Sequence, residues 1–588
     1  MELTAALTER FGFPAFRRGQ REACEAALAG RDVLVVMPTG SGKSLCYQLP
    51  ALLRDDLTVV VSPLVALMQD QVEALHARGL GDSVALLNAQ QDQAANAEAL
   101  SQAIAGELRL LYVAPERFSS PGFVRRLREA RVGLFVVDEA HCVSQWGHDF
   151  RPDYFRLADA ARALGAEAIV AATATATHQV AVDIVRRLRL SEPLRVATGF
   201  DRPNISFAVA RPAPHEKHAM LLGALGDAEA LPAIVYAGTR AGAEDMASLI
   251  GRELGEKAAA YHAGLDRERR AAVQRAFLAD EVQVVVATNA FGMGVDKPNV
   301  RSVVHASVPA SLEAYYQEAG RAGRDGLPAR ALLLAENRDK ALHVHFIKRD
   351  ELRPELARAL AERLVFAADG EGRYEIGAAE LARALGLNGD QLRALVGHLA
   401  QAGALQPMPS AADRITGRLL AEFDRRAEAL TRASMAEAGR ARWRQYREMW
   451  EYVDSDSCRR AALLDHFGDS AAPAPSGACC DSCEPPLLEG LAPEPEQLAA
   501  EVGTLDDAII SVVRSARPSV GRTTCAEILH GARTKKIERN SYDGLPAYAT
   551  SSRMRRSDIL SRIDELIGER RLETTKGPYP VLQLPSAA

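Results

Sequence analysis

The feature that most constrains the fold is an alternation of short apolar segments with amphipathic segments from Val33 to about His345. The apolar segments are rich in β-branched residues, as in DVLVVMP, LTVVVSP, VGLFVVDE, PAIVYAG and VQVVVATN. Such runs between helices are typical of parallel strands whose two faces are both covered. The sequence therefore predicts an α/β fold with parallel sheets, in two sets that separate near Asp201.

Length and charge set the frame for function. A chain of 588 residues is too long for one hydrophobic core, so several domains are expected. Neither an apolar run of about 20 residues nor a signal peptide is found, and we expect a cytoplasmic protein without a membrane partner. The net charge of -6 gives no general attraction to nucleic acid, so DNA affinity must come from local basic patches.

A phosphate-binding loop, MPTGSGKS, follows the first strand. Its glycines let backbone N–H groups approach phosphate oxygens at a helix N-terminus. We expect Lys43 to bridge the β- and γ-phosphates and Ser44 to hold magnesium. The residues predicted to bind the phosphates are Thr39, Gly40, Ser41, Gly42, Lys43 and Ser44. The alternative, a chance glycine-rich turn, does not explain why the loop follows a strand and precedes a helix.

Two adjacent carboxylates, Asp138 and Glu139, end the apolar strand VGLFVV. Asp138 is expected to complete the magnesium site, and Glu139 to polarise the attacking water. Two solvated acids at a strand end would be the alternative. Together with the phosphate loop, the pair predicts a nucleoside triphosphatase.

An aromatic segment follows these acids directly. In VVDEAHCVSQWGHDFRPDY, the residues Trp146, His148, Phe150, Arg151 and Tyr154 crowd into nine positions. Aromatic and guanidinium faces beside a phosphate site suit stacking on unpaired bases. Here the sequence resembles the RecQ family of DNA helicases, and SQWGHDFRP is similar to that family's aromatic-rich loop. The resemblance covers nearly the whole chain except about residues 350–440.

The resemblance implies two tandem RecA-like lobes, followed by a helical zinc-binding module and winged-helix domains. We expect lobe 1 at 1–200, lobe 2 at 201–349, the zinc-binding module at 441–485, a linker at 486–502 and an RQC-like winged helix at 503–588. Residues 350–440 are expected to form a helical insert with its own winged-helix-like unit, because leucines recur at helical spacing around a Gly-containing turn. The family's further C-terminal helical module is not expected.

The resemblance also assigns residues to the nucleotide. In FGFPAFRRGQ, Gln20 is expected to bond the adenine edge, with Phe13 stacked on its face and Arg17 beside it. In the second lobe, Arg324 is the expected arginine finger with Arg321 as its neighbour. Gly294, Asp296 and Gln317 are further residues expected at the nucleotide.

The implied function is an ATP-dependent DNA helicase that moves 3′ to 5′ on single-stranded DNA and unwinds duplex or branched DNA in recombination and repair. Single-strand-binding and recombination proteins are expected partners, with the protein near the nucleoid. The residues expected to hold or sense the DNA strand are Ser62, Trp146, Phe150, Arg151, Thr239, Arg240 and Asn289.

A cysteine cluster, CRRAALLDHFGD followed by CCDSC, resembles the RecQ zinc module. Cys458, Cys480 and Cys483 match that pattern, whereas Gly477 stands at the remaining position. Cys479 lies two residues away and is the expected substitute, since four thiolates suit tetrahedral zinc. His466, Asp481 or water are alternatives for the fourth ligand, and a site of free thiols is a further alternative.

The C-terminal segment is basic and resembles the RQC winged helix. From Arg514 onward it carries 14 Lys or Arg against 8 Asp or Glu, a net +6. Lys535 and Lys536 are expected to track phosphates, and Tyr579 in the turn KGPYP is expected to stack on a terminal base pair. A solvated helix face, and a ring packed on its own hairpin, are the respective alternatives.

Two other function classes compete with a helicase on DNA. An ATP-switched remodeller would bind duplex DNA and hydrolyse ATP without processive unwinding, and the helix-turn-helix insert slightly favours it. An RNA helicase is the third possibility, against which the aromatic loop and the RQC-like end argue. We expect ATP, Mg²⁺ and Zn²⁺ as cofactors.

Overall fold

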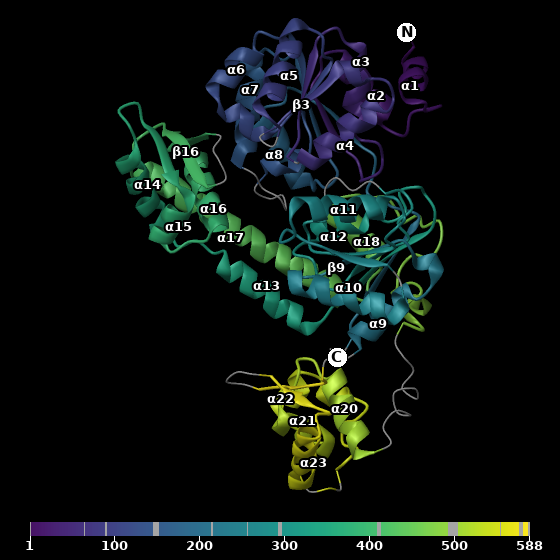
Figure 1. The fold of residues 1–588 in the computed structure, drawn as a ribbon. Helices are drawn as coiled ribbons and strands as arrows, with labels where there is room; N and C mark the ends of the chain where they lie inside the picture. Colours follow the sequence, from purple (N-terminus) through teal and green to yellow (C-terminus); the bar gives the residue numbers. More distant parts are fainter. Residues whose placement is uncertain are drawn as a thin grey trace.

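The computed structural model consists of two α/β lobes, an insert beside them and a separate C-terminal unit (Figure 1). It describes residues 2–63, 65–88, 91–144, 152–212, 216–255, 257–291, 297–408, 413–491, 504–552, 554, 556–575 and 580–585. Within these residues, no helix combines the length and the apolar character needed to cross a membrane.

Lobe 1 contains a seven-stranded parallel sheet in the order β3-β4-β2-β5-β6-β1-β7. Its strands are β1 (Val33–Val36), β2 (Leu57–Val61), β3 (Val84–Leu87), β4 (Leu110–Val113), β5 (Val132–Val137), β6 (Ala168–Thr173) and β7 (Leu194–Ala197). Side chains alternate between the two faces, so Val33 and Val35 join one hydrophobic core and Leu34 and Val36 join the other. The predicted parallel sheet covered on both faces is therefore confirmed.

Helices on the two faces of this sheet come from different halves of the lobe. One core contains α1 (Leu3–Phe11), α2 (Gln20–Leu28), α3 (Leu45–Leu53) and α4 (Val65–His76). The other contains α5 (Gln93–Ala105), α6 (Pro121–Leu127), α7 (Leu157–Leu164) and α8 (His178–Leu188). Short 3₁₀ helices join them: η1 (Gly81–Ser83), η2 (Pro115–Ser119), η3 (Ala140–Val143) and η4 (Pro152–Arg156).

Lobe 2 repeats this plan with a six-stranded parallel sheet in the order β10-β11-β9-β12-β13-β8. The strands are β8 (Ile205–Ala210), β9 (Ala233–Tyr236), β10 (Ala258–Tyr261), β11 (Val284–Ala287), β12 (Ser302–His305) and β13 (Ala329–Leu334). One face is covered by α9 (Lys217–Leu225) and α10 (Arg240–Leu254), and η5 (Ala228–Ala230) lies between α9 and β9. The other face packs on α11 (Arg267–Leu278) and α12 (Leu312–Ala319).

The zinc-binding module extends this second face of lobe 2. A 30-residue helix, α17 (Arg425–Asp454), places Met449, Trp450 and Val453 in the lobe 2 core, and α18 (Arg459–His466) adds Leu463. The helix α13 (Asn337–Arg349) leaves lobe 2 beside α17 and leads to the insert. The module continues to η6 (Pro485–Leu488).

The insert has its own sheet and its own core. Its elements are α14 (Glu355–Ala367), β14 (Arg373–Gly377), α15 (Ala378–Leu385), α16 (Gly389–Gln401), β15 (Leu405–Met408) and β16 (Arg414–Leu419). The strands form an antiparallel sheet in the order β14-β16-β15. Leu381, Leu392, Leu395 and Leu399 are buried with Tyr374 in one cluster. A helix, a strand, two further helices and a two-stranded hairpin, in this order, are the arrangement of a winged helix.

The predicted limit between insert and zinc-binding module, residue 440, falls inside α17, which is continuous from residue 425 to 454. The stretch is rich in Ala, Glu and Arg, and the single Gly439 does not break it. The sequence pattern therefore misplaced this limit, because one helix serves both units.

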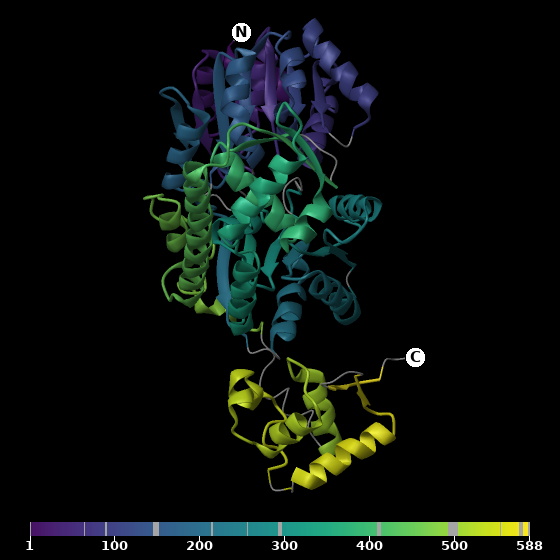
Figure 2. The same ribbon diagram turned by 90° about the vertical axis from the view of Figure 1, so that its left-hand side faces the viewer.

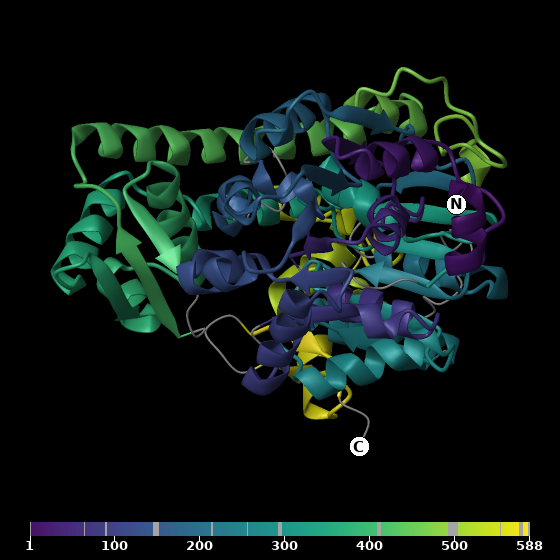
Figure 3. The ribbon, with the colours of Figure 1, turned by 90° about the horizontal axis from the view of Figure 1, so that it is seen from above.

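The insert also reaches lobe 1. Helix α16 contacts η4, and β15 contacts η2. A groove of about 710 Å³ at this contact is lined by Arg125, Arg156, Gln401 and Pro407, among others. Figure 2 shows the insert in front of the junction between the lobes, and Figure 3 shows α17 running from it to lobe 2. The insert thus bridges the two lobes.

The C-terminal unit lies beyond lobe 2 (Figure 1). It consists of α20 (Leu505–Ser515), α21 (Arg522–His530), α22 (Lys535–Arg539), η7 (Tyr542–Gly544), α23 (Arg556–Gly568), β17 (Glu573–Thr574) and β18 (Leu582–Gln583). Ile509, Ile528, Ile563 and Leu582 share one buried cluster. The two short strands pair antiparallel, as in a small wing.

Candidate nucleotide site and metal centre

The phosphate loop connects the C-terminal end of β1 to α3 and has the conformation that phosphate binding needs. Gly40 and Gly42 have φ values of +82° and +81°, which L-residues with side chains rarely adopt. A Cβ on Gly42 would lie 2.5 Å from Nε2 of Gln20. Ser41 Oγ donates to the carbonyl of Pro38 at 2.6 Å and closes the turn. Only glycine therefore fits at position 42.

The two carboxylates meet the phosphate loop because β5 and β1 are parallel and flank β6, so their C-terminal ends share one edge of the sheet. Lys43 Nζ lies 3.6 Å from Asp138 Oδ1 and 3.3 Å from Glu139 Oε1. All three side chains are nearly buried, with exposures of 14% for Lys43, 6% for Asp138 and 10% for Glu139. The predicted grouping of loop, lysine and acids is present in space.

Burial and charge act on these acids in opposite directions. For Glu139, burial alone would raise the pKa, but the Lys43 ammonium and His141 outweigh it and lower the pKa below its ordinary value. For Asp138, burial dominates over the attraction of Lys43 and raises the pKa. Glu139 is thus held in the charged form that a general base requires.

Glu139 also has an unusual backbone. Its φ of +47° lies in the left-handed region, which costs a non-glycine residue about 1–3 kcal/mol. His141 Nδ1 lies 3.3 Å from Glu139 Oε2 and 3.0 Å from Oγ1 of Thr173, the last residue of β6. The backbone turn aims the carboxylate back toward the phosphate loop, and His141 fixes it there.

The residues predicted to read adenine are close to the loop, although two of them bond to the loop itself. Gln20 is buried, and its Nε2 donates to the carbonyls of Ser41 at 3.0 Å and Gly42 at 3.2 Å. Arg17 Nη1 donates to the Gly40 carbonyl at 2.6 Å. Phe13 is 42% exposed beside Phe11, so its ring is available for stacking. Gln20 therefore supports the phosphate loop in addition to any contact with a base.

Lobe 2 closes the other side of this site. A cavity of about 350 Å³ is lined by the phosphate loop, Arg17 and the turn at 323–326 that carries Arg324. A Cβ on Gly40 would lie 3.3 Å from Cγ of Arg324, so the two lobes touch here. Arg321 is 5% exposed, and Gln317 lies in the preceding helix α12. Gly294 and Asp296 lie outside the described residues.

Sequence reasoning missed Arg202. It lies between β7 and β8, and its Nη1 donates to the carbonyls of Thr39 in lobe 1 at 3.3 Å and Gly320 in lobe 2 at 2.7 Å. Its Nη2 donates to Ala322 O at 2.8 Å and Gly323 O at 3.4 Å. The run DRPN after lobe 1 signals a linker but not an arginine that joins the lobes.

The residues predicted to contact DNA are spread over several elements. Trp146, Phe150, Arg151 and Tyr579 lie outside the described residues. Thr239 caps α10, and Thr239, Arg240 and Asn289 are exposed, whereas Ser62 is 1% exposed. Lys535 and Lys536 are exposed on α22 in the C-terminal unit, where Lys536 Nζ donates to Thr524 Oγ1 at 2.8 Å.

One described residue connects the aromatic segment with the acids. Tyr154, the last residue of the segment and part of η4, is buried, and its hydroxyl donates to the backbone carbonyl of Asp138 at 3.1 Å. Tyr154 therefore joins η4 to the C-terminal end of β5.

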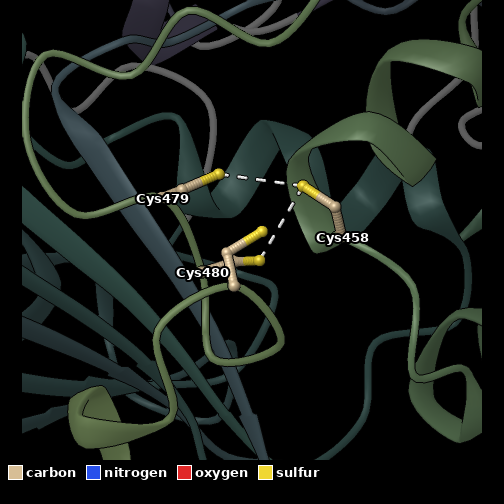
Figure 4. A group of neighbouring side chains, drawn as sticks. Cys458, Cys479 and Cys480 are labelled. Carbon is tan, nitrogen blue, oxygen red and sulfur yellow. Dashed lines mark hydrogen bonds between the residues drawn. The ribbon is translucent and has the colours of Figure 1, made fainter.

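The four cysteines form a compact group, and Figure 4 labels three of them, Cys458, Cys479 and Cys480. The Sγ atoms of Cys458, Cys479, Cys480 and Cys483 all lie within 4.8 Å of one another. Cys458 Sγ is 3.7 Å from Cys479 Sγ and 3.8 Å from Cys480 Sγ. A tetrahedral zinc about 2.3 Å from each thiolate would space the sulfurs about 3.8 Å apart. The residues present fit zinc.

The geometry also bears on the fourth ligand. Cys479 joins the group although it directly precedes Cys480. His466 instead bonds Glu313 through Nε2 at 3.1 Å, and Asp481 bonds Arg459 and the backbone N–H of Val209. The substitute expected from the sequence, Cys479, is therefore the residue that the structure brings into place.

Comparison with known proteins places these sites in a family. The chain matches the DEAD/DEAH box helicase family at residues 17–184, the helicase conserved C-terminal domain at 216–326, the RecQ zinc-binding domain at 420–484 and the RQC domain at 502–588. The two helicase matches support ATP as the nucleotide. The zinc-binding match and the four-cysteine group together support zinc.

Named relatives are similar to the chain over more than half of its length. The chain is 46% identical over 344 residues to the ATP-dependent DNA helicase RecQ of Pasteurella multocida, covering 58% of this chain and 53% of that protein. The chain thus spans about half the length of that relative. It is 34% identical to the probable ATP-dependent DNA helicase RecS of Bacillus subtilis, covering 82% of this chain and 92% of that protein. It is 30% identical to the ATP-dependent DNA helicase RecQ of the same organism, covering 98% and 81% respectively. With two lobes, a four-cysteine module and these relatives, the chain belongs to the RecQ family.

Proposed function

We propose that the protein is an ATP-dependent DNA helicase that translocates 3′ to 5′ on single-stranded DNA and unwinds duplex or branched DNA in recombination and repair. One observation carries this proposal. Pro38–Ser41 of the phosphate loop and the arginine turn of lobe 2 line a single cavity, and Lys43 in the same loop lies beside Asp138 and Glu139, so one nucleotide would contact both lobes. Single-strand-binding and recombination proteins are its proposed partners, at the nucleoid.

Nucleotide binding begins with a change of partner for Lys43. In this structure its ammonium neutralises Asp138 and Glu139. When phosphates enter the loop, the ammonium would turn to the β- and γ-oxygens and release the acids. Ser44 and Asp138 would hold magnesium, which neutralises phosphate charge when bound.

Hydrolysis then depends on Glu139 and on lobe 2. Glu139, held by His141, which Thr173 contacts in turn, would orient and deprotonate the attacking water. Arg324 and Arg321 would stabilise the charge that develops on the γ-phosphate. Loss of that phosphate removes the contact between the nucleotide and the arginines of lobe 2, and the resulting opening and closing would step the strand.

A strand-displacement assay tests the proposal. With ATP and a duplex that carries a 3′ single-stranded tail, we expect displacement that a 5′-tailed duplex does not support. An ATP-switched remodeller would instead bind and hydrolyse ATP on both substrates without releasing a strand. Greater stimulation of ATP hydrolysis by RNA than by DNA would point to an RNA helicase.

The aromatic segment is predicted to couple DNA to ATP hydrolysis. Trp146→Ala should keep basal ATP hydrolysis but lose most of its stimulation by single-stranded DNA, because Tyr154 links this segment to Asp138. Loss of one stacked base costs about 1–3 kcal/mol of binding. ATP hydrolysis with increasing DNA measures the effect. Phe366→Ala, which removes a 93% exposed ring from the insert, is the control and should behave as wild type. Normal stimulation in Trp146→Ala would remove the segment from this role.

The insert is predicted to act as a spacer or protein contact rather than as a DNA reader. His398 is buried and its Nδ1 lies 2.7 Å from Ser434 Oγ, while Arg393 pairs with Asp390. His398 is therefore out of reach of phosphates, and Arg393 is the single basic side chain that α16 exposes. Since α17 serves both units, the deletion should remove residues 351–424 and join α13 to α17 through a short linker. DNA-stimulated ATP hydrolysis should stay largely intact. A tenfold rise in the DNA dissociation constant, about 1.4 kcal/mol, with a flatter salt dependence would contradict this prediction.

A further inference from the structure

The linker between the lobes, residues 198–204, carries one side chain that touches the nucleotide site from both sides. Arg202 bonds the carbonyl of Thr39, which belongs to the phosphate loop, and the carbonyls of Gly320, Ala322 and Gly323. Gly320, Ala322 and Gly323 directly follow α12. The last carbonyl groups of a helix have no hydrogen-bond donor within the helix. A cation is favoured there by the helix dipole.

A second linker residue supports the same turn. Asn204 Nδ2 donates to the carbonyls of Gly323 at 2.8 Å and Leu327 at 2.7 Å. Gly323 has φ of +56°, and a Cβ there would lie 2.3 Å from Asn204 Nδ2. The turn that carries Arg321 and Arg324 is therefore packed against the linker.

The zinc-binding module holds the linker from its other side. Arg460 of α18 is 1% exposed and donates to Asp201 Oδ1 at 2.5 Å, Arg202 O at 2.8 Å and Ile205 O at 2.5 Å. Asp469 accepts from the N–H of Phe200 at 2.7 Å, and the ring of Phe467 stacks on Phe200 with centroids 4.4 Å apart. Side chains of the module thus contact consecutive linker residues.

We propose that Arg202 is a positioning residue for ATP hydrolysis, which sets the arginine turn of lobe 2 against the phosphate loop, and that Arg460 fixes Arg202 from the zinc-binding module. This inference rests on the proposed function, since it assigns a role in ATP hydrolysis. The contacts from Arg460 to Asp201 and Arg202 then connect the zinc-binding module to the nucleotide site, and the cysteines need not touch the nucleotide.

The two ends of the guanidinium explain why arginine stands at position 202. Nη1 spans the lobes, and Nη2 holds the turn, so two donor groups act at once. A lysine carries its N–H donors on one nitrogen and lacks the planar fork, so it cannot reproduce the contacts of Nη1 and Nη2 together. If the contacts of Nη1 or Nη2 are lost, Arg321 and Arg324 no longer have a fixed position relative to the phosphate loop. Binding by the phosphate loop would persist, because the loop has Lys43 and its own backbone N–H groups.

Kinetics of Arg202 variants test the proposed role of Arg202 in ATP hydrolysis. In Arg202→Gln we expect kcat for DNA-stimulated ATP hydrolysis to fall by at least about tenfold, while KM for ATP changes by less than about threefold. Arg202→Lys should recover part of the lost kcat. Arg54→Gln is the matched control, because Arg54 bonds Ala27, Asp56 and Glu167 within lobe 1 only. It should lower the melting temperature and leave kcat unchanged. An unchanged kcat in Arg202→Gln, or full activity in Arg202→Lys, would overturn the proposal.

Variants of Arg460 and Asp201 test whether the zinc-binding module acts on Arg202. Arg460→Met should show the same selective fall in kcat while keeping one zinc per chain by elemental analysis. Should that variant fail to fold, Asp201→Asn removes the ion pair from its more exposed side and should show a smaller fall in kcat. Wild-type kcat in a folded, zinc-loaded variant would overturn the link. Absence of ATP hydrolysis in the wild-type protein would instead refute the proposed function itself.

Discussion

Replacing Lys43 with alanine is expected to abolish ATP hydrolysis, with a fall in rate of at least about 100-fold. Lys43 is the cation at the meeting point of the phosphate loop, Asp138 and Glu139. Its removal leaves the phosphate charge unbalanced and leaves two buried carboxyl groups without their ammonium. Both effects weaken the binding of the nucleotide phosphates. Steady-state ATP hydrolysis and titration with a fluorescent adenosine nucleotide measure the two effects.

A buried lysine of lobe 2 provides the control. Lys217 Nζ pairs with Glu336 Oε2 at 2.9 Å, and the lysine side chain is 3% exposed. Lys217→Ala therefore also removes a buried ion pair, but far from the phosphate loop. It should lower the melting temperature while each folded molecule hydrolyses ATP normally. Equal losses of hydrolysis in both variants would show that Lys43 acts through stability alone.

Glu139→Gln separates the chemistry from binding. The amide cannot accept the proton of water, and a general base contributes about 10²–10⁴-fold in rate. Nucleotide affinity should stay within a few-fold of wild type, since Lys43 is then released from one of its two acids. Hydrolysis near the wild-type rate would mean that another group is the base.

The second large effect is expected at the cysteines. Cys480→Ser should remove the zinc, lower the melting temperature and solubility, and weaken DNA binding. The reason lies in the edge of lobe 2. The N–H of Phe207 in the edge strand β8 donates to Cys479 O at 3.2 Å, and the N–H of Asp481 donates to Phe207 O at 3.1 Å. Without zinc this segment loses its anchor to Cys458, and β8 loses its covering.

Elemental analysis and thermal unfolding measure this prediction. Wild-type protein should carry one zinc per chain, and Cys480→Ser should carry none. Cys525→Ser is the control, because Cys525 is equally buried but lies in α21 of the C-terminal unit. It should keep its zinc. Freshly purified wild-type protein without stoichiometric zinc would refute the metal assignment.

Several features could be predicted from the sequence because each depends on neighbouring residues. The phosphate loop needs two glycines, a lysine and a serine in one turn, and its strand and helix lie directly beside it. The apolar strands required parallel sheets, since both of their faces must be covered. The leucines of residues 381–399 required a small separate core. The cysteine spacing indicated zinc but left the fourth ligand open, because sequence distance does not give the direction of a side chain.

Other features were decided only by the tertiary structure. The strand order places β6 between β5 and β1, and this order brings Lys43 to Asp138 and Glu139 from 95 residues or more along the chain. The role of Arg202 depends on three carbonyls of a turn more than 100 residues away and on one carbonyl of the phosphate loop. Carbonyls leave no trace in a sequence, because every residue has one. The sequence by itself determined the motifs and the sheets, whereas contacts to backbone atoms across the lobes arose only from packing.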